Sequence, residues 1–257
     1  MSKKTIVEAV RNGRILVSDG AWGTELQKRG FRFGECPEIW NLDQPDAVRD
    51  IARSYAKAGA DLVETNSFGA SRLKLDHFGR ADDTARINEA AARLSREGAG
   101  PDRWVLGSVG PTGRMLLMED TTEAELHDVF GEQAEALERG GADAICIETM
   151  SAVDEALCAV RAARERTSCD VICTFTFERT AKGDYRTLMG ASPEEAAVAA
   201  VEAGAQVVGT NCGNGMERMV EILRLMRKAT DGRIPLLVHA NAGLPRPVEG
   251  GFVYPES

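Results

Sequence analysis

The chain has 257 residues, of which 43% are apolar, 28% charged and 5% aromatic, an ordinary composition for a folded globular protein. This composition excludes a disordered chain, a collagen-like chain and a small disulfide scaffold, and the length allows one large domain. The 31 basic and 40 acidic residues give a formal net charge of −9 without a basic stripe, so nucleic acid is not expected as a partner.

The sequence also argues against a membrane protein. No segment reaches the roughly 20 apolar residues that cross a bilayer, and residues 1–10 have no uninterrupted apolar run of a secretory signal. The six cysteines have no regular spacing, and most lie within apolar runs, which favours reduced, buried thiols over a disulfide framework. We therefore expect a cytoplasmic location and no membrane partner.

Short apolar runs, each followed by a longer amphipathic stretch, predict seven β-strands. Near-continuous apolar runs are typical of parallel strands that are buried on both faces. In chain order the predicted strands are 15–21, 61–66, 104–110, 142–149, 170–177, 205–211 and 235–242.

The segments between these runs carry helix signals. Ser192 followed by proline and Glu195, and Thr122 followed by Glu125, predict two helix starts. Helix ends are predicted at three glycines, namely Gly59, Gly140 and Gly204. Strand and helix therefore alternate along the chain.

A pattern of Gly-Ala, an apolar strand and then polar residues recurs at 58–66, 140–149 and 203–211. Repeated βα units of this size favour an α/β fold of the (β/α)8 TIM barrel type, with an open doubly wound sheet as the alternative. No Gly-x-Gly-x-x-Gly or Walker sequence follows a strand, which argues against a nucleotide site. Residues 243–257 contain three prolines and show no eighth strand. We expect one barrel domain over residues 1–257 that is incomplete at its C-terminus.

In such a barrel the functional site lies at the C-terminal ends of the strands. Three carboxylates are predicted there, Asp19, Glu64 and Glu148, and no Lys or Arg partner is evident. Such a group suits a ligand that carries an ammonium group, although the same acids also suit turn capping and bonds to loop amides. Other polar residues at predicted strand ends are Asn66, Ser108, Asn211, Cys212 and Asn241.

The cysteines and His239 have structural and functional interpretations. Cys212 precedes Gly-Asn-Gly and should expose its thiol at the rim, where the residues alone favour a structural cysteine over a metal ligand. Cys146 is predicted in the barrel interior, and Cys169 and Cys173 lie about 13 Å apart along one strand, too far for one metal ion. His239 is predicted to be a hydrogen-bonded core histidine rather than a catalytic one.

Six sequence blocks, in this order along nearly the whole chain, resemble the homocysteine S-methyltransferase family. They are Asp-Gly-Ala-Trp-Gly-Thr-Glu-Leu (19–26), Glu-Thr-Asn-Ser-Phe-Gly-Ala (64–70), Gly-Ser-Val-Gly-Pro-Thr-Gly (107–113), Ile-Glu-Thr-Met (147–150), Gly-Thr-Asn-Cys-Gly (209–213) and Asn-Ala-Gly-Leu-Pro (241–245). The resemblance implies a barrel in which zinc, bound by three cysteines, holds the thiolate of homocysteine for attack on an activated methyl group, giving methionine.

The resemblance also implies residue roles. Cys212 matches the first zinc cysteine, and Asn241 matches an asparagine that occupies the fourth zinc position when substrate is absent. Asp19 and Glu148 match acids that hold the amino group of homocysteine, so Cys212, Glu148 and Asp19 form the predicted catalytic set. The predicted substrate-binding set is Asp19, Gly20, Ala21, Glu64, Asn66, Ser108 and Glu148, with backbone amides after Asp19 near the substrate carboxylate.

Two features leave alternatives open. The other two zinc cysteines of the family form an adjacent pair that has no counterpart before Ser257, and we expect them beyond that residue. A barrel without them would instead serve as a non-catalytic binding subunit for a corrinoid protein.

The blocks at 64–70 and 209–213 look more like cobalamin-dependent methionine synthases than betaine enzymes. A methylcobalamin-carrying protein or domain is therefore the expected donor, with betaine and S-methylmethionine as alternatives. A lyase or aldolase is disfavoured because no lysine ends a predicted strand.

Overall fold

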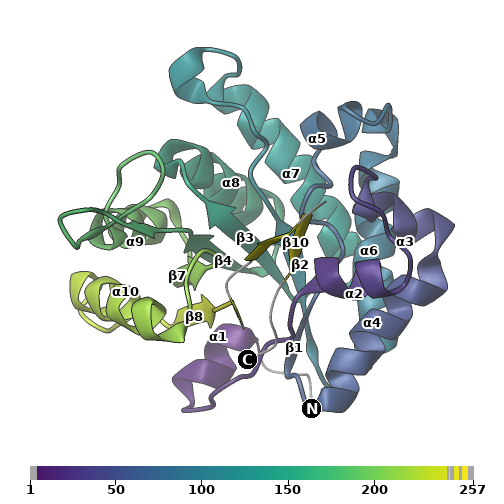
Figure 1. Cartoon of the computed structure of the whole chain (residues 1–257), viewed down its shortest axis with the longest axis horizontal. Coiled ribbons are helices and arrows are strands. Elements are labelled where there is room, and N and C mark those ends of the chain that lie inside the picture. The colour runs from purple at the N-terminus through teal and green to yellow at the C-terminus, as the bar shows by residue number, and fades with distance from the viewer. Residues whose placement is uncertain (1–4, 242, 244–245, 249–250, 254–257) are drawn as a thin grey trace.

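The computed structural model describes residues 5–241, 243, 246–248 and 251–253. Its centre is a curled parallel sheet of six strands (Figure 1). In sheet order these strands are β1 (Leu62–Glu64), β2 (Trp104–Val109), β3 (Ala144–Met150), β4 (Asp170–Phe175), β7 (Val207–Asn211) and β8 (Leu236–His239).

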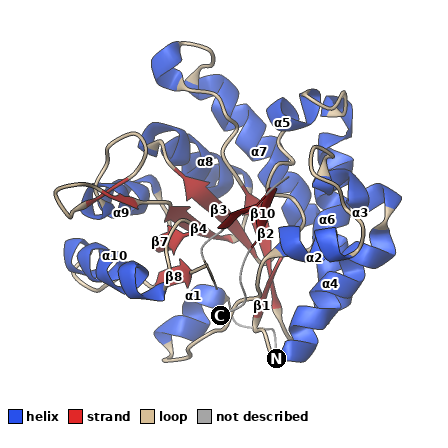
Figure 2. Cartoon of the chain, viewed as in Figure 1, coloured by secondary structure: helices blue, strands red, loops and turns tan. Residues whose placement is uncertain are grey.

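Long helices follow the strands and cover the outer side of the sheet (Figure 2). They are α4 (Pro45–Ala58), α6 (Thr84–Ala99), α7 (Glu123–Gly140), α8 (Val153–Arg166), α9 (Pro193–Ala203) and α10 (Met216–Ala229). The shorter helices are α1 (Ile6–Arg11), α2 (Trp22–Lys28), α3 (Trp40–Asp43) and α5 (Arg72–Asp76), with 3-10 turns η1 (Pro37–Ile39), η2 (Ala81–Asp83) and η3 (Leu116–Met118). Two small hairpins pair β5 (Glu178–Arg179) with β6 (Tyr185–Arg186) and β9 (Arg246–Val248) with β10 (Gly251–Val253).

The TIM-barrel prediction is confirmed in this curled sheet, in which strands and helices alternate as expected. Within the described residues no eighth strand joins the sheet beyond β8. Within the same residues, no helix combines the length and the hydrophobicity that a bilayer crossing requires.

The first predicted strand, 15–21, is wrong in extent because the segment forms only a single bridge, between Ser18 and Leu62. The backbone N–H of Asp19 donates to the Leu62 carbonyl, so this segment does lie beside β1. Ile15 and Val17 are 91% and 58% exposed, because among the described residues no strand pairs with the outer edge of the segment. The segment therefore contributes one bridge to the sheet and no regular ladder.

The helix signals are confirmed. Ser192 and Glu195 form a reciprocal capping box at α9, and the Thr122 side chain accepts a hydrogen bond from the Glu125 backbone at α7. The helix α7 ends at Gly140, as predicted, and Gly141 after it takes the left-handed conformation. A Cβ on Gly140 would lie 2.3 Å from the Glu89 carbonyl oxygen, so this glycine allows α6 to approach closely.

Side chains alternate between two cores along each sheet strand, as the pleat requires. Val105, Ile145, Ile147, Val171 and Val208 point outward to the helices. The inner core contains Leu62, Leu106, Ala144, Cys146, Ile172 and Leu237, and α1 packs on it through Ile6, Val7 and Ala9. An inward position nearer the C-terminal end of each strand is polar, and these positions form the candidate site.

Candidate functional site

One polar side chain from each sheet strand points inward above the inner core. Because the strands are parallel, their C-terminal ends meet at one opening, and the two-residue period places these side chains on one face. Counted from the inner-core residues, they are Glu64, Ser108, Glu148, Thr174, Asn211 and His239.

Glu148 lies at the centre of the group and is 8% exposed. The Ser108 hydroxyl donates to its Oε1, and the Asn211 amide donates to its Oε2 over 3.1 Å. Burial raises the pKa of Glu148 to about 7, the Ser108 bond opposes this rise, and the charge of Asp19 adds to it. The carboxyl therefore carries a fixed orientation but an incomplete negative charge at neutral pH.

Asp19 lies in the segment 15–21 beside β1, and its carboxylate accepts several hydrogen bonds. Its Oδ2 accepts hydrogen bonds from Trp22 Nε1 at 2.9 Å and from the Glu64 backbone at 2.8 Å. Burial raises its pKa to about 6, although these hydrogen bonds act in the opposite direction. The predicted contacts Gly20 and Ala21 directly precede α2, and the Ala21 carbonyl accepts the Tyr55 hydroxyl at 2.9 Å.

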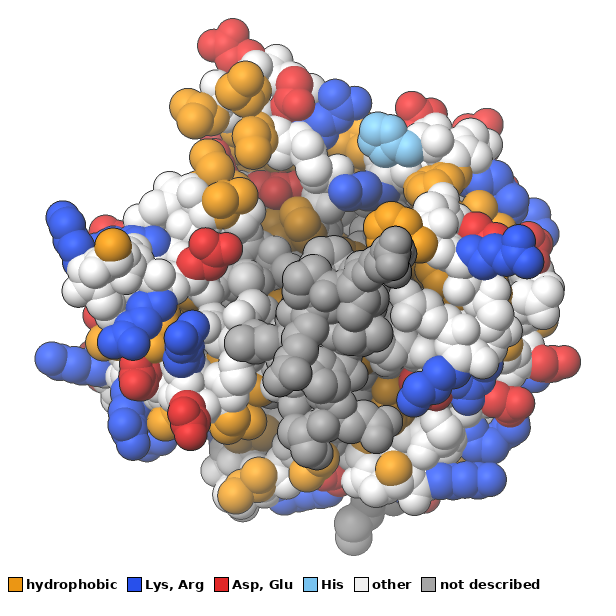
Figure 3. Space-filling view, in the orientation of Figure 1, with side chains coloured by type: hydrophobic (Ala, Val, Ile, Leu, Met, Phe, Trp, Pro, Cys, Tyr) orange, Lys and Arg blue, Asp and Glu red, His pale blue; other side chains and the backbone are white. Residues whose placement is uncertain are grey.

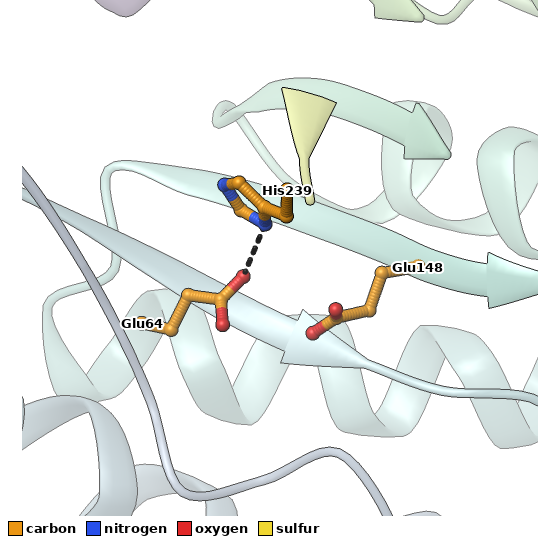
Figure 4. A group of neighbouring side chains, drawn as sticks. All are labelled: Glu64, Glu148 and His239. Carbon is orange, nitrogen blue, oxygen red and sulfur yellow. Dashed lines mark ion pairs between the residues drawn. The ribbon is translucent and has the colours of Figure 1, made fainter. Parts of the chain in front are cut away.

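Glu64 and His239 face each other across the opening, with 3.5 Å between Oε1 of Glu64 and Nδ1 of His239 (Figure 4). Burial, followed by the charges of Glu148 and Asp19, raises the pKa of Glu64. Burial lowers the pKa of His239 to about 4, so its ring is neutral at neutral pH.

The prediction of a hydrogen-bonded core histidine is wrong for His239. Its Nε2 is buried and has no hydrogen-bond partner among the described residues, and the same holds for Oε1 of Glu64. Ligand atoms of Glu64, Glu148 and His239 all lie within 4.8 Å of one another (Figure 4). Two carboxylates and a neutral imidazole are donors that suit a divalent cation as well as an ammonium group.

Cys212 directly follows β7 and is exposed, as predicted. Its sulfur lies 3.5 Å from the Asn211 amide nitrogen, and its backbone N–H donates to the His239 carbonyl at 3.1 Å. Although the residue as a whole is exposed, withdrawal of the sulfur from water and then the charge of Glu148 raise the pKa of the thiol. The predictions that Cys146, Cys169 and Cys173 are buried are confirmed.

Asn66 and Asn241 have backbone and loop contacts rather than contacts with the acids. The Asn66 amide donates to the Pro37 carbonyl at 2.7 Å and to Asn41 Oδ1 at 3.2 Å, which attaches the loop after β1 to η1 and α3. The Asn241 backbone N–H donates to the Asn214 carbonyl at 3.2 Å, beside the Cys212 loop. Roles for these two side chains in binding substrate or metal stay predictions.

Sequence reasoning placed Asn211 at a strand end but assigned it no role, and it did not single out Thr174. Both follow from the same signal, because each lies an even number of residues beyond an inner-core residue of its strand, Thr174 beyond Ile172 and Asn211 beyond Val207. Counting inward positions along every predicted strand finds them.

The fold and the site together define a TIM-type α/β barrel with buried carboxylates at the C-terminal ends of its strands. Residues 16–257 match the family model described as homocysteine S-methyltransferase. The chain belongs to the homocysteine S-methyltransferase family, and the resemblance drawn from its six blocks is confirmed.

Two relatives that are named for different activities match the chain. Methionine synthase of Mycobacterium tuberculosis is 35% identical over 264 residues, which covers 96% of this chain and 22% of that protein. Betaine--homocysteine S-methyltransferase 1 of Rattus norvegicus is 31% identical over 250 residues, which covers 94% of this chain and 60% of that protein. The chain thus spans about a fifth of the length of the mycobacterial methionine synthases.

A solved structure confirms the fold. The metallated form of the homocysteine methyltransferase MmuM from Escherichia coli superposes with a TM-score of 0.77 over 92% of this chain and 87% of that chain. The two sequences are 21% identical, so the likeness supports the barrel architecture alone.

The raised pKa of Glu148 predicts a stability that depends on pH. The ordinary value is 4.5 and the folded value is about 7, so the folded chain binds an extra proton between them. This contribution to stability is complete below about pH 4.5 and is lost as the pH rises through 7. Glu148→Gln should therefore raise the free energy of unfolding by about 1–3 kcal/mol at pH 8 and by much less at pH 5, measured by urea unfolding.

Glu135→Gln is the matched control for this measurement. Hydrogen bonds from Arg166 lower the pKa of Glu135, so its loss should reduce stability at pH 8 instead of raising it. Parallel pH profiles for the wild-type chain and Glu148→Gln would contradict the assigned environment of Glu148.

Proposed function

We propose that this chain binds homocysteine by its ammonium group at the acid-lined opening and catalyses methyl transfer to its thiol, giving methionine. The observation that carries this proposal is the group of Asp19, Glu64 and Glu148. Among the described residues no Lys or Arg lies within ion-pair distance of any of the three. A ligand ammonium supplies the missing positive charge and three donors, and family membership names a substrate that has one.

The contacts of each acid fit a binding role. Glu148 is oriented by Ser108 and Asn211, and Asp19 is oriented by Trp22, so neither carboxylate has to reorganise when an ammonium arrives. We assign both to the substrate ammonium and neither to bond making. Backbone amides at Gly20 and Ala21 are assigned to the substrate carboxylate, as the family resemblance implies.

Zinc is the metal that the family resemblance implies. All six cysteines lie in the described part of the chain, and only Cys212 is exposed, so these residues fit one thiolate of a three-thiolate site. We propose Cys212 as that ligand, with Asn241 near it across the backbone contacts of the two loops. Bound zinc lowers the pKa of a thiol, so that the substrate sulfur is a thiolate at neutral pH.

The proposal includes a methylcorrinoid protein as donor and a cytoplasmic location. The sequence blocks at 64–70 and 209–213 support this donor, and six unpaired cysteines fit a reducing compartment. Exposed apolar side chains follow the C-terminal ends of several strands and offer a surface for a protein donor, and one group of hydrophobic side chains gathers at the upper left of Figure 3. They are Phe68 after β1, Met115, Leu117 and Met118 after β2, Leu188 and Met189 after β4, and Met216 after β7.

Replacing Glu148 by glutamine tests the ammonium site. The change keeps the size of the side chain and removes its charge, so a charge-assisted hydrogen bond is weakened by roughly 1.5–3 kcal/mol. Homocysteine affinity, measured by calorimetry, should fall about ten- to a hundredfold. Glu155→Gln is the control, because Glu155 is equally buried but bonds Thr112. Equal affinities for Glu148→Gln and the wild-type chain would reject the assignment.

Metal analysis tests the zinc ligand. With one thiolate, the 257-residue chain should hold zinc weakly against a chelating resin, and Cys212→Ala should hold less. His239→Gln should not change the zinc content, because His239 is outside the proposed ligand set. Tightly held zinc that survives Cys212→Ala but is lost in His239→Gln would assign the metal to Glu64, Glu148 and His239 instead.

Separate incubations of the zinc-supplemented chain with homocysteine and methylcobalamin, betaine or S-methylmethionine test the donor. Methionine, measured by mass spectrometry, should form with methylcobalamin and not with the other two donors. Cys212→Ala and a protein-free sample give the background rates. Turnover with betaine alone would reject the corrinoid proposal.

A further inference from the structure

We propose that Thr65 and Ser67 are positioning residues, whose hydroxyls take the place of a sheet strand beside Ser108 and thereby fix the side chain that orients Glu148. The consequence for ligand binding rests on the proposed function, in which Glu148 receives the substrate ammonium. The effect on Ser108 rests only on contacts within the chain.

Strand β1 ends before its neighbour β2 does. The ladder between them stops at the pair of Glu64 and Leu106, with one further bond from the Thr65 backbone N–H to the Leu106 carbonyl at 3.0 Å. β2 continues to Val109, and the backbone N–H and carbonyl of Ser108 face the side that β1 has left. Ser108 is 2% exposed, so these two polar groups need partners that β1 does not supply.

Two hydroxyls of the loop after β1 supply these partners. The Ser108 backbone N–H donates to Oγ1 of Thr65 at 2.9 Å, and the Ser67 hydroxyl donates to the Ser108 carbonyl at 2.7 Å. The hydroxyl oxygens of Thr65 and Ser67 are 2.6 Å apart. A hydroxyl has one proton, and Ser67 gives its own to the carbonyl, so Thr65 must donate to Ser67. The three bonds form a closed ring with a single direction, in which each bond polarises the next.

The loop that carries the two hydroxyls is itself fixed from outside. The side-chain amides of Asn41 in α3 and Gln133 in α7 donate to the carbonyls of Asn66 and Ser67, each over 2.8 Å. Thr65 and Ser67 are 3% and 0% exposed, so water does not compete for their hydroxyls. The ring therefore attaches β2 to a loop that has little freedom to move.

The ring acts on the site through the Ser108 side chain. This hydroxyl donates to Oε1 of Glu148, and its place is set by the β2 backbone that the ring holds. Without it, the Asn211 amide is the remaining side-chain donor to Glu148 among the described residues. A carboxylate that has to reorganise binds an ammonium less tightly than one that is already oriented.

The first measurement is amide hydrogen exchange at Ser108, followed by NMR without ligand. Thr65→Val keeps the shape of the side chain and removes the hydroxyl. The buried Ser108 N–H then loses its acceptor and should exchange about tenfold faster or more. Thr65→Ser keeps the hydroxyl and should exchange within about twofold of the wild-type rate. Ser67→Ala opens the ring at its other hydroxyl, and it replaces Thr65→Val if that variant does not fold, as judged by circular dichroism.

Thr210→Val is the matched control for the loss of a buried threonine hydroxyl. Thr210 is 0% exposed, and its hydroxyl has no hydrogen-bond partner in the described part of the chain. The same substitution there breaks no bond, so the Ser108 exchange rate should not change.

A double-mutant cycle connects the ring to the ligand. In calorimetry, Thr65→Val should weaken homocysteine binding about three- to tenfold, and Thr65→Ser should bind as the wild-type chain does. Because Thr65 acts through Ser108, Thr65→Val should cause less than about a twofold further loss in the Ser108→Ala background. A general loss of packing would weaken binding equally in both backgrounds.

Ser108 exchange that is unchanged in the folded ring variants, or equally accelerated in Thr210→Val, would overturn the proposal. So would a homocysteine affinity that Thr65→Val leaves unchanged or reduces equally in both backgrounds. Homocysteine that binds neither the wild-type chain nor the variants would reject the proposed function, while the exchange rates would still decide the role of Thr65 and Ser67.

Discussion

The alternation of side chains along parallel strands is the constraint on which the rest of this structure depends. It sends one set of apolar residues outward to the helices and another inward to a core closed by α1. Nearer the C-terminal ends of the strands, the same alternation brings Glu64, Glu148 and Asn211 together from strands that are distant in the sequence. The site is therefore a direct continuation of the barrel interior, and its walls exclude water because the core below them is packed.

That exclusion of water explains the electrostatics of the opening. Burial is the first cause of the raised pKa values of Asp19, Glu64 and Glu148, and the charges of neighbouring acids add to it at Glu64 and Glu148. Ionisation of these three carboxyls therefore costs stability at neutral pH. The ammonium group of the proposed ligand would offset this cost.

Much of the fold was accessible from local sequence patterns. Apolar runs located the six sheet strands, and the capping residues Ser192 and Thr122 located two helix starts, because these signals depend on neighbours a few residues away. The first strand was overestimated, since pairing depends on a partner that the run itself does not reveal. The local pattern predicted the helix end at Gly140 but not the close approach of a second helix there, which depends on a segment elsewhere in the chain.

For the site, the sequence by itself determined which chemistry-bearing residues end the strands, and its six blocks determined the family. The tertiary structure alone decided what these residues touch. It placed His239 against Glu64, directed the Asn66 side chain to η1 and α3, and made Asn211 a partner of Glu148. These contacts join residues that are tens to hundreds of positions apart, so they are set by the curvature and register of the sheet, which no local pattern encodes.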